Sequence, residues 1–95
     1  MLERVLPIGS VVRLKNATKR LMIIGYCKYK AGDNETIYDY AGVLFPEGFM
    51  SPAETALFNH EDVEHIYALG YQDEDRFVFE QKLHDAIDEV KPFDK

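Results

Sequence analysis

The chain has 95 residues, enough for one domain with a small core, and 46% of them are hydrophobic, which excludes an intrinsically disordered chain. Its one cysteine, Cys27, excludes an intrachain disulfide and a four-cysteine zinc site. The formal net charge of −6 disfavours general nucleic-acid binding, because an acidic chain repels the phosphate backbone.

The charge is divided unevenly along the chain. Residues 1–30 carry seven basic side chains and one acidic one, a net of +6, whereas residues 31–95 carry four basic and sixteen acidic ones, a net of −12. The basic part could form one local positive face, although a solvated strand pair with alternating Lys and Arg is the commoner explanation. No signal-peptide pattern or apolar stretch of bilayer-spanning length is visible, so we expect a cytoplasmic protein with no membrane partner.

Three strands are predicted in the first half of the chain. Polar turns at Asn16–Lys19 and Ala31–Thr36 separate them. In the second strand, the continuous apolar run Leu21–Ile24 is typical of burial on both faces, and Gly25 indicates a bulge or bend. The three strands are Ser10–Lys15, Arg20–Lys30 and Ile37–Phe45.

Residues 55–75 are less regular, and after them the spacing of apolar residues changes from that of a strand to that of a helix. Thr55–Phe58 could be a short strand, Asn59 is a candidate cap for one helical turn, and His65–Tyr71 has strand alternation. Acidic residues at 73–75 then predict the start of a helix of about 16 residues, which Pro92 ends.

One apolar stripe follows this helix, and Glu80 lies off the stripe. The stripe either covers the sheet, the commoner outcome, or projects toward a partner. Its members are Phe79, Leu83, Ala86, Ile87 and Val90.

These elements predict an α+β fold. We expect a small curled antiparallel sheet or an SH3-like partly open barrel of about five strands, with a C-terminal α-helix. A single domain would span residues 1–95, with the sheet in 6–71 and the helix in 73–91.

Motifs for chemistry are not found. The glycines are isolated, so no phosphate-binding loop is present, and His60 and His65 are five residues apart, a poor match to helical zinc motifs. Cys27 lies in an apolar strand, where a thiol packs as a small hydrophobe. We expect no catalytic residue, no cofactor and no metal.

The tyrosines are the more informative aromatic residues. Tyr26, Tyr38 and Tyr40 lie on adjacent strands and would be either core residues with wet hydroxyls or a recognition platform that stays partly exposed beside Phe45 or Phe49. The full set of candidate protein-binding residues is Tyr26, Tyr38, Tyr40, Phe45, Phe49, Phe79, Leu83, Ile87 and Val90.

Four segments together resemble a family of short Gram-positive bacterial proteins known as a domain of unknown function. The resemblance covers about residues 6–90 and implies context rather than catalysis, because members are commonly encoded beside type VII secretion loci and LXG-type toxins. It implies no catalytic residues. The segments that carry it are 6–12, 19–25, 38–48 and 65–71.

The leading functional hypothesis is therefore a cytoplasmic, non-enzymatic accessory protein, a chaperone-like adaptor that holds or escorts a toxin through protein–protein contact. One alternative is a toxin-neutralising immunity protein with an acidic surface that mimics nucleic acid. Another is a small-molecule-binding domain or enzyme with a site in the barrel mouth. A homodimer through paired sheet edges is also open.

Overall fold

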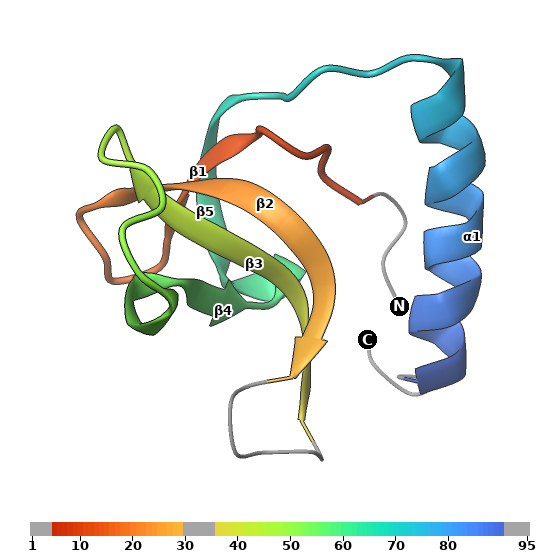
Figure 1. Cartoon of the computed structure of the whole chain (residues 1–95), viewed down its shortest axis with the longest axis horizontal. Coiled ribbons are helices and arrows are strands. Elements are labelled where there is room, and N and C mark those ends of the chain that lie inside the picture. The colour runs from red at the N-terminus through yellow and green to blue at the C-terminus, as the bar shows by residue number, and fades with distance from the viewer. Residues whose placement is uncertain (1–4, 30–35, 91–95) are drawn as a thin grey trace.

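A five-stranded antiparallel sheet and one long helix form the protein (Figure 1). The computed structural model describes the backbone of residues 5–29 and 36–90 and the side chains of 5–27 and 36–86. The sheet is open, with strand order β4-β3-β2-β1-β5, so the predicted α+β class and curled sheet are confirmed, and the finer SH3-like shape stays a prediction. The elements are β1 (Val11–Leu14), β2 (Arg20–Tyr29), β3 (Ile37–Phe45), the 3-10 turn η1 (Pro52–Glu54), β4 (Ala56–Phe58), the 3-10 turn η2 (His60–Asp62), β5 (Val63–Ala68) and α1 (Glu74–Val90).

Local turn and bulge signals are confirmed. Asn16 adopts a left-handed φ of 63° in the turn between β1 and β2, a conformation that asparagine tolerates. The pairing of β2 with β3 shifts register between Ile23 and Gly25, where the bulge was expected. Figure 1 shows β2 and β3 curving strongly together, which is how a small sheet encloses a core.

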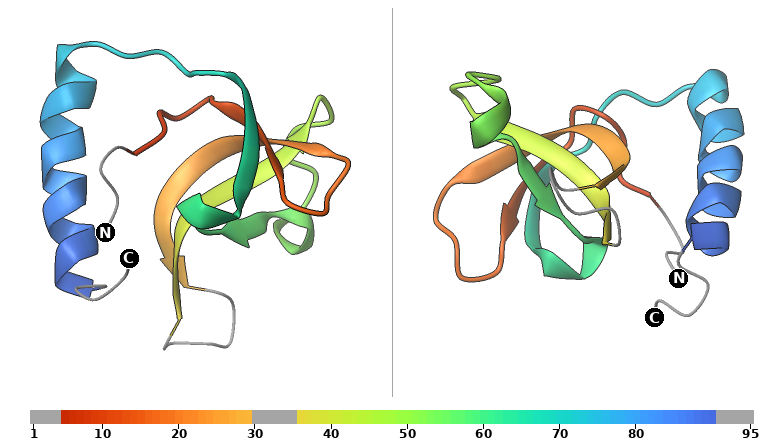
Figure 2. Two further views of the ribbon diagram at one scale, coloured as in Figure 1. Left: turned by 180° about the vertical axis from the view of Figure 1, so that it is seen from behind. Right: turned by 60° about the horizontal axis from the view of Figure 1, so that its bottom comes forward.

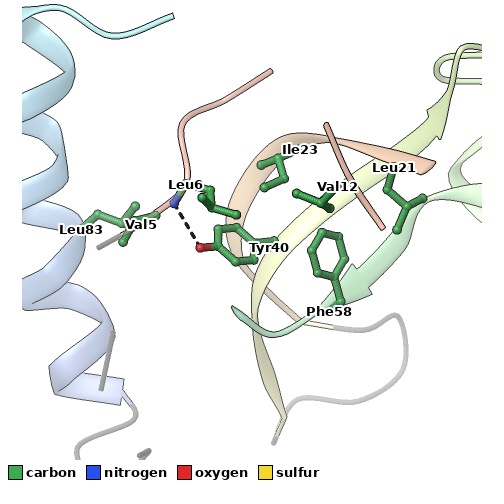
Figure 3. Close-up of a cluster of buried hydrophobic side chains, with 8 residues drawn as sticks. All are labelled: Val5, Leu6, Val12, Leu21, Ile23, Tyr40, Phe58 and Leu83. Carbon is green, nitrogen blue, oxygen red and sulfur yellow. Dashed lines mark hydrogen bonds between the residues drawn. The ribbon is translucent and has the colours of Figure 1, made fainter. Parts of the chain in front are cut away.

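The predicted burial of β2 on both faces is wrong. Leu21 and Ile23 are buried, but Ile24 is 41% exposed. The open sheet has one core-facing side here, so only alternate residues of the apolar run reach the core. Figure 3 shows most of the buried side chains within the curl of the sheet, with Val5 and Leu83 next to each other beside α1. They are Val5, Leu6, Val12, Leu21, Ile23, Tyr40, Phe58 and Leu83.

Residues 5–10, which precede β1 and are called the N-terminal segment below, lie between the helix and the sheet (Figure 2). Val5 and Leu6 are buried, and the following residues pair with β2, since the N–H of Gly9 donates to the Ile23 carbonyl (2.8 Å). In both views of Figure 2, α1 stands beside the curled sheet with this segment between them. The helix therefore packs on the N-terminal segment, instead of covering the sheet directly or standing free.

The last strand ends three residues before its predicted end. β5 stops at Ala68, because the chain at Gly70 crosses tightly over Ile8–Ser10. The N–H of Gly70 donates to the hydroxyl of the buried Ser10 (3.1 Å), so this N–H is satisfied outside the ladder. A Cβ at residue 70 would lie 1.8 Å from the Ile8 carbonyl oxygen. Only glycine permits this crossing.

We predict that Gly70→Ala destabilises the fold by about 2 kcal/mol, because the added methyl group must displace backbone. Urea unfolding followed by circular dichroism measures the change. Leu69→Ala, at an exposed neighbouring position, is the control and should change the free energy of unfolding by less than about 0.5 kcal/mol. Equal stability of Gly70→Ala and the wild type would contradict the close crossing.

Candidate functional site

Of the three tyrosines proposed as either core or a recognition platform, Tyr26 and Tyr40 pack with the core. Tyr26 pairs with Tyr40 across β2 and β3, with ring centroids 6.0 Å apart. Tyr40 is 0% exposed and packs on Phe58, as the core alternative predicts for this residue. Tyr26 and Tyr38 are half-buried. Tyr40 therefore belongs to the core alternative.

The hydroxyl groups of this pair hold the N-terminal segment. The N–H of Leu6 donates to the Tyr40 hydroxyl (3.1 Å), and the Tyr26 hydroxyl donates to the Leu6 carbonyl (2.5 Å). The Tyr40 hydroxyl also lies 2.7 Å from Nδ1 of His60, and the backbone N–H of His60 donates to an Asp39 carboxylate oxygen (2.9 Å). Both polar groups of the Leu6 backbone are thus satisfied by tyrosines.

Burial raises the pKa of Tyr40 far above the usual tyrosine value of about 10, and it raises the pKa of Tyr26 as well. The nearby Arg76 guanidinium opposes the shift at Tyr26, but desolvation is the larger effect. Both hydroxyls therefore stay protonated at neutral pH and act as structural hydrogen-bonding groups.

A buried ion pair holds α1 against the same segment from the other side. Arg76 Nη1 lies 2.9 Å from Glu80 Oε1, and both side chains are about nine-tenths buried. Glu80 Oε2 accepts a hydrogen bond from the N–H of Val5 (3.2 Å), and Arg76 Nη2 donates to the Val5 carbonyl. We call Arg76, Glu80 and Val5 the helix anchor. The sequence placed Glu80 off the apolar stripe; its i,i+4 spacing from Arg76 was the signal that could have identified the pair.

The predicted helix stripe is divided in the structure. Leu83 is buried beside Val5 (Figure 3), whereas Phe79 is half exposed although its ring contacts Tyr26, with centroids 6.2 Å apart. The side chains of Ile87 and Val90 lie outside the described residues. Leu83 thus packs on the N-terminal segment, and Phe79 contacts Tyr26 but stays half in solvent.

The outer side of the sheet carries a group that the sequence analysis did not assemble. The Arg20 guanidinium lies over the Phe45 ring, 5.1 Å from its centroid, and 6.0 Å from the centroid of Tyr67. Arg13 Nε donates to the Tyr67 hydroxyl (3.3 Å). We call Arg13, Arg20, Phe45 and Tyr67 the arginine face. Phe49, the other aromatic candidate near β3, is strongly exposed in the loop beyond it.

The remaining titratable candidates are dispersed. His60 contacts Tyr40, His65 stacks against Tyr67, and His84 lies 3.7 Å from Glu80. Among the described residues, no three His, Cys, Asp or Glu side chains are grouped as metal ligands would be. Within the same ranges, no helix is long and apolar enough to cross a membrane.

We predict that Glu80→Ala destabilises the protein by about 3 kcal/mol, because it leaves the Arg76 charge buried without its carboxylate and the Val5 N–H without an acceptor. The double variant Arg76→Met/Glu80→Leu should be less destabilised, since it removes both charges. Urea unfolding measures both, and Asp85→Ala, on the exposed side of α1, is the control. Equal stability of Glu80→Ala and Asp85→Ala would contradict the anchor.

We predict that the protein loses stability above about pH 10. The unfolded tyrosines ionise there while Tyr40 and Tyr26 remain protonated in the fold, so the unfolded state binds fewer protons and stability falls as pH rises. Each such group contributes a slope of about 1.4 kcal/mol per pH unit. Tyr40→Phe should reduce the slope by that amount, whereas Tyr71→Phe, which alters an exposed ring, should not. Identical slopes for wild type and Tyr40→Phe would contradict this account.

Comparison with known proteins gives one match. A family model described as a domain of unknown function (DUF4176) matches residues 5–79, which include the N-terminal segment, all five strands and the first turn of α1. No curated protein and no solved structure matches the chain. The expected membership in a family of unknown function is confirmed, and the Gram-positive origin and secretion context stay predictions. Because the family model matches most of the 95 residues, the chain belongs to the DUF4176 family.

Proposed function

We propose that this protein is a non-enzymatic protein-binding module. The observation that carries the proposal is a run of three exposed apolar side chains on α1: Phe77 is 53%, Val78 61% and Phe79 50% exposed. Consecutive helix residues point in different directions, so this run presents apolar surface over a wide arc of the helix. Such surface is unfavourable in water and is typical of a contact site. Leu69 and Tyr71, just before α1, are exposed as well.

The hydrogen bonds of the buried polar side chains support the same function. Tyr40, His60, Arg76 and Glu80 hydrogen-bond with one another or with the backbone of the N-terminal segment. These groups therefore contribute to the rigidity of the surface on which α1 is displayed. A rigid surface loses less conformational entropy when a partner binds, so the entropy cost of binding is smaller.

In finer terms, we propose a cytoplasmic, chaperone-like accessory protein of a type VII secretion or LXG toxin system in Gram-positive bacteria. The resemblance described above supports this context, and the exposed run on α1 supports the physical role of covering an apolar segment of an unexported toxin. Phenylalanine and valine side chains would supply the buried contacts that dominate affinity in such interfaces.

An immunity protein is the second candidate, favoured by the net charge of −12 over residues 31–95. A complex of an acidic immunity protein with a basic nuclease toxin would weaken steeply with salt. An apolar escort complex through α1 would change little with salt. Measuring how far Phe77→Ser/Val78→Ser weakens the complex at high salt separates the two candidates, because charge contacts are screened there and only the escort complex depends on the apolar run.

We predict that the purified protein forms a stoichiometric complex with a toxin encoded beside its own gene, and that Phe77→Ser/Val78→Ser weakens this complex about thirtyfold, because loss of a central contact costs about 2 kcal/mol. Calorimetry measures the affinity, and a melting curve shows that the variant is folded. The control is Gln81→Ser/Lys82→Ser, at exposed positions on the same helix. Failure of the neighbouring toxins to bind, or equal binding by both variants, would disprove the proposal.

A further inference from the structure

Two arginines face each other on the side of the sheet turned away from the core. Arg13 on β1 is the direct antiparallel partner of Arg20 on β2. The Cβ atoms of such partners are about 5 Å apart, and like charges directly opposite are destabilising. Their neighbours Val12 and Leu21 point the other way and are buried, so the arginines lie on the outer side. The chain thus concentrates positive charge on one face, although its net charge is −6.

The two arginines are neutralised unequally. Arg13 lies 3.7 Å from a carboxylate oxygen of Glu64 and donates to the Tyr67 hydroxyl and the Ala17 carbonyl. For Arg20, no carboxylate lies within salt-bridge distance in residues 5–29 and 36–90, and its side chain is exposed. The Glu47 carboxylate interacts with Arg20 only at longer range, because it pairs with Lys19 at 2.6 Å. The positive charge of Arg20 therefore remains available to an external anion.

Two aromatic rings restrain the position from which the Arg20 guanidinium would bind that anion. Its guanidinium is close to both Phe45 and Tyr67, at 5.1 and 6.0 Å from the ring centroids. A cation–π contact restrains the guanidinium group while its N–H groups can still donate, which suits two-point binding of a carboxylate. Tyr67 is 49% exposed, so apolar ring surface lies next to the charge.

We propose that the arginine face binds an acidic segment of a protein partner, in which carboxylates stand beside an aromatic or aliphatic side chain. Arg20 and Arg13 bind the carboxylates, and the Tyr67 and Phe45 rings contact the apolar neighbour. The proposal rests on the protein-binding function and adds a second surface to the exposed run on α1. A nucleic acid is disfavoured, because two guanidinium groups are a small site on a chain that is acidic overall.

The test measures fluorescence anisotropy of three labelled probes at low salt: a short peptide of glutamates and phenylalanines, the same peptide with lysines in place of the glutamates, and an oligothymidine strand. We expect the glutamate peptide to bind best, and its affinity to fall about tenfold between about 20 mM and about 200 mM salt. Binding of the oligothymidine or the lysine peptide as tightly as the glutamate peptide would overturn the proposal without any variant being needed.

Variants then locate the site. Arg20→Gln should weaken binding of the glutamate peptide about tenfold, and Arg20→Lys, which keeps the charge but loses the two-point geometry of the guanidinium, should weaken it less. Lys82→Gln removes one positive charge from exposed α1 and should leave the affinity unchanged. If Arg20→Gln is unfolded by circular dichroism, Tyr67→Ser replaces it and should weaken binding in the same way. Equal affinity of the folded variant and the wild type would overturn the assignment.

The two proposals can fail separately. If a neighbouring toxin binds the wild type and Arg20→Gln equally, and the glutamate peptide does not bind, the protein-binding function stands and the arginine face is wrong. If the peptide binds through Arg20 but no neighbouring toxin binds, the arginine face stands and the proposed toxin partner is wrong.

Discussion

The rest of the structure depends on one constraint, the burial of the backbone of Val5 and Leu6. The backbone of Val5 and Leu6 lies between the sheet and α1, where water cannot satisfy its N–H and carbonyl groups. Tyr26 and Tyr40 satisfy Leu6 from the sheet, and Arg76 and Glu80 satisfy Val5 from the helix. The segment would be strongly unfavourable in this place without these four side chains, because each buried polar group needs a partner.

This arrangement explains why the helix keeps so much apolar surface outside. Arg76, Glu80 and Leu83 share one side of the helix, which faces the segment, so Phe77 and Val78, at other angles around the helix axis, are left in solvent. The helix is attached by a narrow, specific contact instead of a broad hydrophobic one. The sheet likewise leaves its outer side free, where Arg20 and its aromatic neighbours lie. Both exposed surfaces thus follow from how little of each element the small core can cover.

Much of the fold could be predicted because it depends on local signals. Strand alternation, the bend at Gly25, the turn at Asn16 and the acidic cap at Asp73 each act over a few residues, and each is present in the structure. The candidate site could be predicted only in part. The burial of Tyr40 and Glu80 depends on contacts with residues 34 and 75 positions away along the chain. The local periodicity of the sequence cannot predict such contacts. The facing pair of Arg13 and Arg20 was accessible from the predicted hairpin, but the approach of Tyr67 depends on the distant β5.

The distance along the chain between Val5 and Glu80 also has a consequence for biosynthesis. Val5 is translated 71 residues before Arg76 and 75 residues before Glu80, the two helix residues that bind its backbone. The strands between 11 and 68 can pair while the nascent chain is still growing, but the segment of Val5 and Leu6 cannot take its final place until α1 has emerged. A chain released before residue 76 would leave the backbone polar groups of Val5 without these two partners.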